Sequence, residues 1–221
     1  MATNLDLEEQ EQLDQVKHFW KQYGNLITWL LIIVLGAYAA WNGWNWWQRQ
    51  QGLKAGAIYD AAVQAAQRKD LAALERSVGD LRQGHASSAY ASQGALLGAR
   101  VLQDNGKTPE AMATLRWVAE QGADAGHQAI ARLRLAALMA DAKQIDEALK
   151  LLSASVPAEF AGLVADRRGD LLLLSGKPTE ARAEFTQAWQ ALGTESDYRR
   201  IVEIKLNALG VDPTQSTGAK S

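Results

Sequence analysis

The side chains that most often do chemistry are few and scattered in this sequence. The three histidines, His18, His85 and His127, are far apart, and no paired-ligand spacing such as HExxH occurs. The absence of cysteine excludes thiolate catalysis, cysteine-ligated zinc and iron–sulfur clusters. We therefore expect no metal site and no cofactor.

The carboxylates and glycines form no catalytic constellation either. Asp146, Glu147, Asp166 and Asp170 have helical spacing on polar faces, without a companion base or nucleophile, so a solvated role is favoured. The GALLG string at 94–98 is followed by no lysine–serine pair, and close helix packing explains it. These patterns predict a protein that is not an enzyme and has no small-molecule substrate.

Composition and charge narrow the class of partner. The chain has 221 residues, 48% of them hydrophobic, with 23 basic and 25 acidic side chains. That composition is typical of a globular protein. A formal net charge of −2 gives no positive field for phosphates, so nucleic acid is not an expected partner.

The charges divide the chain into three segments. Residues 1–25 hold five acids and two bases, residues 26–47 hold no formal charge, and residues 48–221 are close to neutral. As a helix, the 22 uncharged residues span about 33 Å, enough to cross a bilayer core. Tryptophans collect at the far end of this segment, as they do at membrane interfaces. We predict an acidic tail at 1–25 and a transmembrane helix at 26–47.

Two properties of that helix stay open on residues alone. Ala37-Tyr38-Ala39 has the small-residue form of a signal-peptidase site, although a long acidic segment before it favours an uncleaved anchor. Its orientation is undecided, because two lysines precede the helix and one arginine and one lysine follow it.

A stripe of small residues follows one face of the predicted transmembrane helix. Gly36, Ala39, Ala40 and Gly43 recur at i, i+3, i+4 and i+7, which would let another helix approach closely. Small residues are also common in such helices without any contact. The stripe is a candidate contact with another transmembrane helix.

Beyond residue 50 the sequence predicts helices only, in repeats. Similar segments at 106–118, 142–154 and 176–188 place alanines at 111, 148 and 181, spaced 37 and 33 residues apart. These spacings bracket the 34 residues of a tetratricopeptide repeat, in which stacked helix pairs share a core. A degenerate pair at 53–88, with Asp70 as a helix cap, precedes them.

The third repeat predicts specific contacts. Gly169 is expected where two helices pack tightly, Gly176 in the turn, and Ala181, Phe185 and Ala188 on the inner face of the second helix. In the two earlier repeats, Gly106 and Lys143 align with Gly176.

After the repeats, a closing helix at 197–209 is expected to use Ile201, Ile204, Leu206 and Leu209 as its apolar face. Residues 210–221 are expected to be a disordered tail. The overall class is all-α, with one transmembrane helix followed by a solenoid at 48–209.

The order of these parts, together with the aromatic FWKQYGN (19–25) before the membrane helix and the helix at 55–67, resembles the YfgM family of ancillary SecYEG translocon subunits. The resemblance implies a bacterial inner-membrane protein with a cytosolic amino terminus and a periplasmic repeat domain. It also implies association with the translocon, with membrane lipid and with the periplasmic chaperone PpiD. It implies no catalytic residue.

Repeat geometry predicts a groove lined by the first helix of each pair. We call its nine expected residues the groove set: Leu96, Arg100, Gln103, Ile130, Leu133, Ala137, Leu163, Asp170 and Leu173. Ordinary packing between repeats is the alternative for each leucine.

We expect a non-enzymatic protein that holds its repeats beside the secretion channel and helps to hand translocated chains to periplasmic chaperones. One alternative is a regulator that sequesters a cytosolic stress-response partner through residues 1–25. The other is a released periplasmic scaffold, if cleavage follows Ala39.

Overall fold

The computed structural model describes the backbone of residues 7–214 and the side chains of residues 17–214, and every regular element in that range is a helix. The all-α prediction is confirmed. The first residues of the acidic tail (1–6) and most of the expected disordered tail (215–221) lie outside the described part. The chain divides into two compact units, Met1–Leu53 and Lys54–Ser221.

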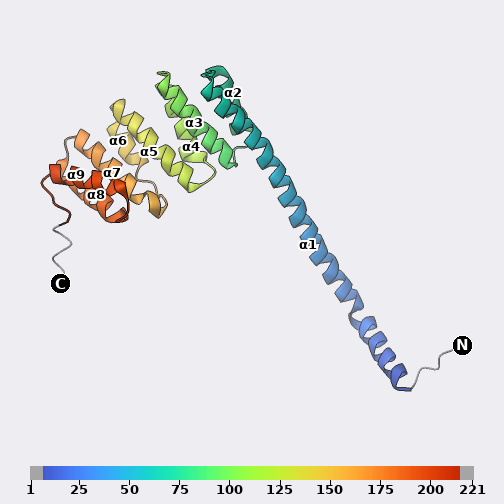
Figure 1. Ribbon diagram of the computed structural model, residues 1–221. Coiled ribbons are helices and arrows are strands. Elements are labelled where there is room, and N and C mark those ends of the chain that lie inside the picture. The colour runs from blue at the N-terminus through green and yellow to red at the C-terminus, as the bar shows by residue number, and fades with distance from the viewer. Residues whose placement is uncertain (1–6, 215–221) are drawn as a thin grey trace, which may run out of the picture. The chain divides into compact units, whose positions relative to one another are not determined.

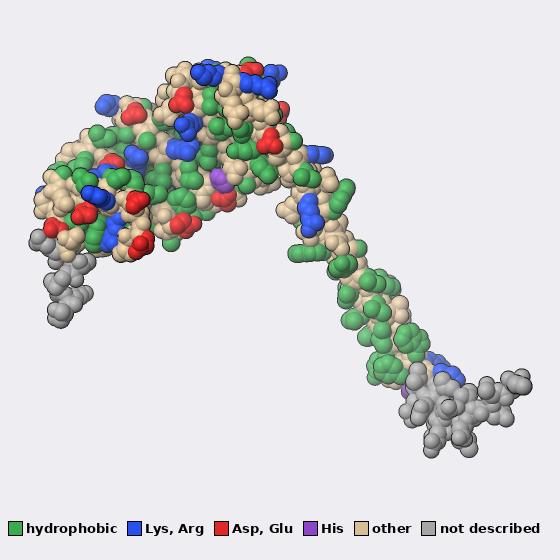
Figure 2. Space-filling view, in the orientation of Figure 1, with side chains coloured by type: hydrophobic (Ala, Val, Ile, Leu, Met, Phe, Trp, Pro, Cys, Tyr) green, Lys and Arg blue, Asp and Glu red, His purple; other side chains and the backbone are tan. Residues whose placement is uncertain are grey.

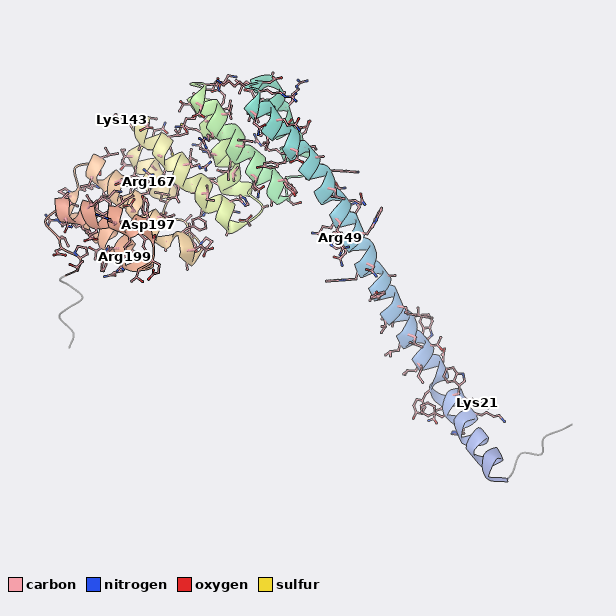
Figure 3. All side chains as sticks on the ribbon, in the orientation of Figure 1. Lys21, Arg49, Lys143, Arg167, Asp197 and Arg199 are labelled. Atoms are coloured by element: carbon pink, nitrogen blue, oxygen red, sulfur yellow. The ribbon has the colours of Figure 1, made fainter. Side chains whose placement is uncertain are left out.

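The first unit consists of the greater part of helix α1 (Leu7–Gln67). Only 6% of its most apolar stretch is buried, so it is not the core helix of a soluble fold. Its large side chains point outward, from Leu30 at 59% exposed to Leu35 at 63% (Figure 2). Lys21 and Arg49 bracket this stretch (Figure 3). Within the described residues, α1 is the one helix long and apolar enough to cross a membrane.

The second unit stacks helices in sequence order, each packed on the next (Figure 1). It begins with residues 54–67 of α1, whose buried side of Ala55, Ala62 and Ala65 faces the neighbouring helices. The helices that follow are α2 (Leu71–Gly84), α3 (Ala89–Asp104), α4 (Thr108–Gln121), α5 (Ala125–Asp141), α6 (Ile145–Leu151), α7 (Ala158–Leu174), α8 (Pro178–Ala191) and α9 (Asp197–Ala208).

One turn geometry recurs along this unit and defines the repeat. Lys69, Gly106, Lys143, Gly176 and Gly210 all have positive φ, between 57° and 78°. At each of them the backbone N–H bonds to the carbonyl three residues back, and the next N–H bonds to the carbonyl five residues back. This is the Schellman ending of a helix. The turns confirm the repeat and the alignment of Lys143 with two glycines.

The same turns show that α9 is the first helix of a further half-repeat. Gly210 ends α9 just as Gly176 ends α7, with Val211 N–H donating to Leu206 O at 3.0 Å. Side-chain caps start α2 and α3: Asp70 accepts from Ala73 N–H at 3.0 Å, as predicted, and Ser88 accepts from Ala91 N–H at 3.2 Å.

Asp124 caps α5 by accepting from His127 N–H at 2.9 Å, and it also pairs with the His127 ring. Hydrogen bonds from His127 lower the pKa of this carboxyl, because they stabilise its charged form. His127 therefore has a structural role.

The close contacts predicted for the third repeat are confirmed. A Cβ on Gly169 would lie 2.5–2.8 Å from the Phe185 ring, so only glycine lets α7 and α8 approach this closely. Ala181, Phe185 and Ala188 are fully buried in one apolar cluster with Val202 and Leu206 of α9.

The apolar face predicted for the closing helix is confirmed for Leu206 and Leu209, which pack in the cluster with Phe185, and is wrong for Ile201 and Ile204. The structure buries Val202 and Leu206, whereas Ile201 is 46% and Ile204 61% exposed. The rotation of α9 that buries Val202 and Leu206 also brings Lys205 to two carboxylates of α7. Ion pairing therefore helps to select which face of α9 packs inward.

Candidate partner-binding surface

The groove set comes from the first helices of successive pairs, α3, α5 and α7. Arg100, Gln103 and Leu173 are exposed, and Leu173 has 38% of its surface accessible. The other members, apart from Leu96, are half-buried: Ile130, Leu133, Ala137, Leu163 and Asp170.

Leu96 does not line a groove, contrary to the expectation for it. It is 8% exposed and packs in the main apolar cluster. Ile130 and Leu133 also pack against that cluster while keeping part of their surface. Helix α3 contacts α5, and α5 contacts α7, so the side of each helix that faces the next repeat is used for stacking. Stacking therefore accounts for these three residues.

The recurring turns show which members of the set are equivalent. Arg100, Ala137 and Asp170 each stand six residues before the positive-φ residue of their repeat, and Ile204 stands six residues before Gly210. Equivalent positions in stacked repeats lie along one surface. The structure thus adds Ile204 to the candidate surface, and its spacing to Gly210 is the sequence signal that could have found it.

Four residues at the end of the stack form what we call the α7–α9 clasp: Asp166, Asp170, Tyr198 and Lys205. Lys205 Nζ lies 2.7 and 2.8 Å from the two Asp166 oxygens and 2.7 Å from Asp170 Oδ1. Tyr198 donates its hydroxyl to Asp166 Oδ2 at 2.7 Å. Charge-assisted bonds of this length are strong when water is excluded.

The clasp overturns the solvated role expected for Asp166, which is 1% exposed. Burial, followed by the bond to Asp166, raises the pKa of Tyr198, so its hydroxyl stays protonated and donates. Asp170 Oδ2 also lies 3.8 Å from Nη1 of Arg167, which Figure 3 labels on α7. One carboxylate of the groove set therefore also fastens α9.

The clasp is a structural contact between α7 and α9. The buried carboxylate of the clasp has no open side for a substrate. Within the described residues, no group of three or more histidine, cysteine or acidic side chains could hold a metal ion. The exposed members of the groove set are the cation Arg100, the amide Gln103 and the apolar Leu173.

The stripe on α1 faces open space within the described chain. A Cβ on Gly36 or on Gly43 would meet no atom within 4 Å, and the neighbouring side chains are exposed. Neither glycine is needed for a contact with another described residue. The stripe therefore leaves this face of α1 free for another helix.

Comparison with known proteins covers both units. The family model described as "Tetratricopeptide repeat-like domain" matches residues 17–211. A Neisseria gonorrhoeae protein is 30% identical over 204 residues, covering 92% of this chain and 98% of its own length. Proteins from Escherichia coli and Haemophilus influenzae are 29% and 28% identical, again over 92% of this chain and over 97% and 98% of their own lengths.

All three relatives carry the name "Ancillary SecYEG translocon subunit". The matches extend over the apolar helix as well as the repeats, so they concern the whole arrangement rather than the repeat alone. The chain belongs to the YfgM family of tetratricopeptide repeat-like proteins.

Proposed function

We propose that this protein is an ancillary subunit of the SecYEG translocon, anchored in the bacterial inner membrane by a single helix. The observation that carries the proposal is the near full-length similarity to proteins of that name. The exposed apolar stretch of α1 supplies the anchor, and membrane lipid covers the part of it that no protein contacts.

The amino terminus is cytosolic in this proposal, and the repeats are periplasmic. There the exposed part of the groove set, extended by Ile204, receives a periplasmic partner such as PpiD and helps to hand translocated chains to it. A stacked-helix surface that mixes apolar, amide and charged side chains suits protein recognition. It offers no ring of cations for a chain-terminal carboxylate.

Photocrosslinking in intact membranes tests this proposal directly. A photoreactive residue in place of Gly36 or Ala40 should crosslink to SecYEG subunits, and one in place of Gln103 or Leu173 to a periplasmic chaperone. The control position is Gln187, exposed on α8 outside the groove set. If photoreactive residues at Gln187 and Leu173 gave the same crosslinked products, the groove set would not be the surface that binds the chaperone.

The small-residue stripe gives a measurable prediction. Changing Gly36 and Gly43 together to leucine should reduce copurification with SecYEG several-fold, because the larger side chains hold a neighbouring helix away. Insertion should be unaffected, since neither position is crowded within the chain. Gly52→Leu, also uncrowded but outside the stripe, is the matched control. Unchanged copurification of the double variant would remove the stripe from the interface.

Topology can be read cleanly because the chain has no cysteine of its own. In intact spheroplasts, a membrane-impermeant maleimide should leave Leu5→Cys unlabelled and should label Gln215→Cys. The labelled protein should have the mass of the full chain, since a chain cleaved after Ala39 would be smaller. The reverse labelling pattern would invert the proposed orientation.

A further inference from the structure

A cavity lies where α2, α3 and α4 meet, and no residue of the groove set lines it. Its volume is about 310 Å³, and Leu74, Val78 and Leu102 give it an apolar lining. A second cavity of about 290 Å³ adjoins it and is lined by Gln83 and Trp117. The two share Gly79 and Arg82, so together they form one recess.

Gly79 keeps this recess open, and the fold does not otherwise need it. A Cβ there would meet no atom within 4 Å, and its φ is not positive. By contrast, a Cβ on Gly98, on the α3 side of the cavity, would lie 3.0 Å from Val78. Glycine inside a helix costs about 1 kcal/mol relative to alanine. Packing compensates that cost at Gly98 but not at Gly79.

Arg82 places an unneutralised cation at one end of the recess. Its guanidinium carbon lies 4.9 Å from the centre of the Trp117 ring, and no carboxylate among the described residues pairs with it. Partial burial lowers its pKa, as expected for a cation that has lost hydration without gaining a counter-charge.

The other charges of the recess lie at its opposite end. Lys107 Nζ is bonded to Glu75 at 2.9 Å, which neutralises both. Glu110 stands seven residues before Trp117 on α4, about 10 Å away along the helix axis. The recess thus has an apolar floor and a net positive end.

We propose that this recess binds an extended polypeptide segment in which an aliphatic side chain stands beside a carboxylate. The aliphatic group fills the cavity over Leu74 and Val78, and the carboxylate accepts hydrogen bonds from Arg82 where that side chain lies over Trp117. A planar guanidinium matches a carboxylate with two parallel bonds. A phosphate group would call for further donors, and among the described residues Arg82 is the only unpaired cation that lines the recess.

This proposal does not rest on the proposed function. It concerns a recess of α2, α3 and α4 that no residue of the groove set lines. The chain could serve the translocon without this site, and the site could bind a segment without any translocon.

The test uses the full chain in nanodiscs of neutral phosphatidylcholine. The probe is a short peptide of Gly, Ser, Leu and Asp with both ends blocked and an uncharged fluorophore, compared with the same peptide carrying Asn for Asp. Fluorescence anisotropy should show the Asp peptide binding about tenfold more tightly, because one charge-assisted hydrogen-bonded pair with Arg82 can supply that difference in affinity. Equal affinity of the two peptides would overturn the proposal.

Variants separate the two halves of the recess. Arg82→Gln should abolish the preference for Asp, whereas Arg76→Gln, exposed on the same helix, should preserve it. Gly79→Leu should weaken both peptides at least tenfold by filling the cavity. It should not lower helicity, because the added side chain starts in open space. A preference for Asp that survives Arg82→Gln would contradict the assignment.

A membrane headgroup is the competing occupant, and the same assay decides it. Short-chain phosphatidylglycerol should not displace the Asp peptide at concentrations below its micelle formation. If it binds in an Arg82-dependent way while the two peptides bind alike, the recess is a lipid site and the polypeptide proposal is wrong.

Discussion

Lys205→Met should destabilise the carboxyl-terminal end of the repeat domain by about 3 kcal/mol, because it leaves the buried Asp166 carboxylate without its counter-charge. Tyr198 still donates one bond, but a neutral hydroxyl does not replace a cation 2.7 Å away. The Tm of a soluble fragment spanning 50–221 should fall by roughly 6–12 °C.

The loss should be local before it is global. Stacked repeats transmit stability mainly to their neighbours, so amide exchange of α9 (residues 197–208) should accelerate far more than that of α3. Lys107→Met is the matched control: it breaks the exposed ion pair with Glu75, which is worth about 0–1 kcal/mol.

A double variant isolates the cause. Replacing Asp166 by Asn as well as Lys205 by Met removes the unpaired charge and should restore part of the lost stability. If the single Lys205 variant melted like the wild type, the clasp would not hold α9 in place.

Ala181→Phe should have the second largest effect, a loss of about 1–3 kcal/mol, because a ring must enter a fully packed contact between α7 and α8. Ala181 has no exposed surface and shares its cluster with Phe185 and Ala188. Gly169 of α7 already admits no added atom against the Phe185 ring of α8, which limits how far α8 can shift.

Leu173→Gln on the same repeat is the comparison. Leu173 is 38% exposed, so a polar replacement should shift the Tm by only a few degrees while weakening capture of a periplasmic partner. Thermal melting by circular dichroism of the 50–221 fragment ranks the two variants. A Leu173 variant that melted well below the Ala181 variant would contradict the placement of Leu173 on the candidate surface.

Much of the third repeat was predictable from local patterns. A glycine opposite a phenylalanine and an alanine at each close approach follow from how tightly two helices can pack, so Gly169, Phe185 and Ala181 were placed correctly. The turn at Gly176 needed only the recognition that a left-handed residue ends the helix. Lys143 adopts the same conformation without the glycine signal, and only its alignment identified it.

The placement of single side chains on the surface was less predictable. Leu96 and Leu173 look alike in sequence, yet one is buried between stacked repeats and the other is exposed. The difference depends on how each helix packs against its neighbours, which local periodicity does not encode. Asp166 was expected in solvent for the same reason: its cation, Lys205, is 39 residues away in the chain.

The residue pattern alone predicts the order of parts: an uncharged stretch long enough to cross a bilayer, then helices repeated every 33 to 37 residues. These features depend on near neighbours, whose spacing directly sets helix faces and turns. The packed fold is needed to see which face of α9 packs inward, which leucines stay exposed and where Arg82 meets Trp117 over an open cavity. Those outcomes depend on ion pairs and packing between residues distant in the chain, where many helix rotations satisfy the same local pattern.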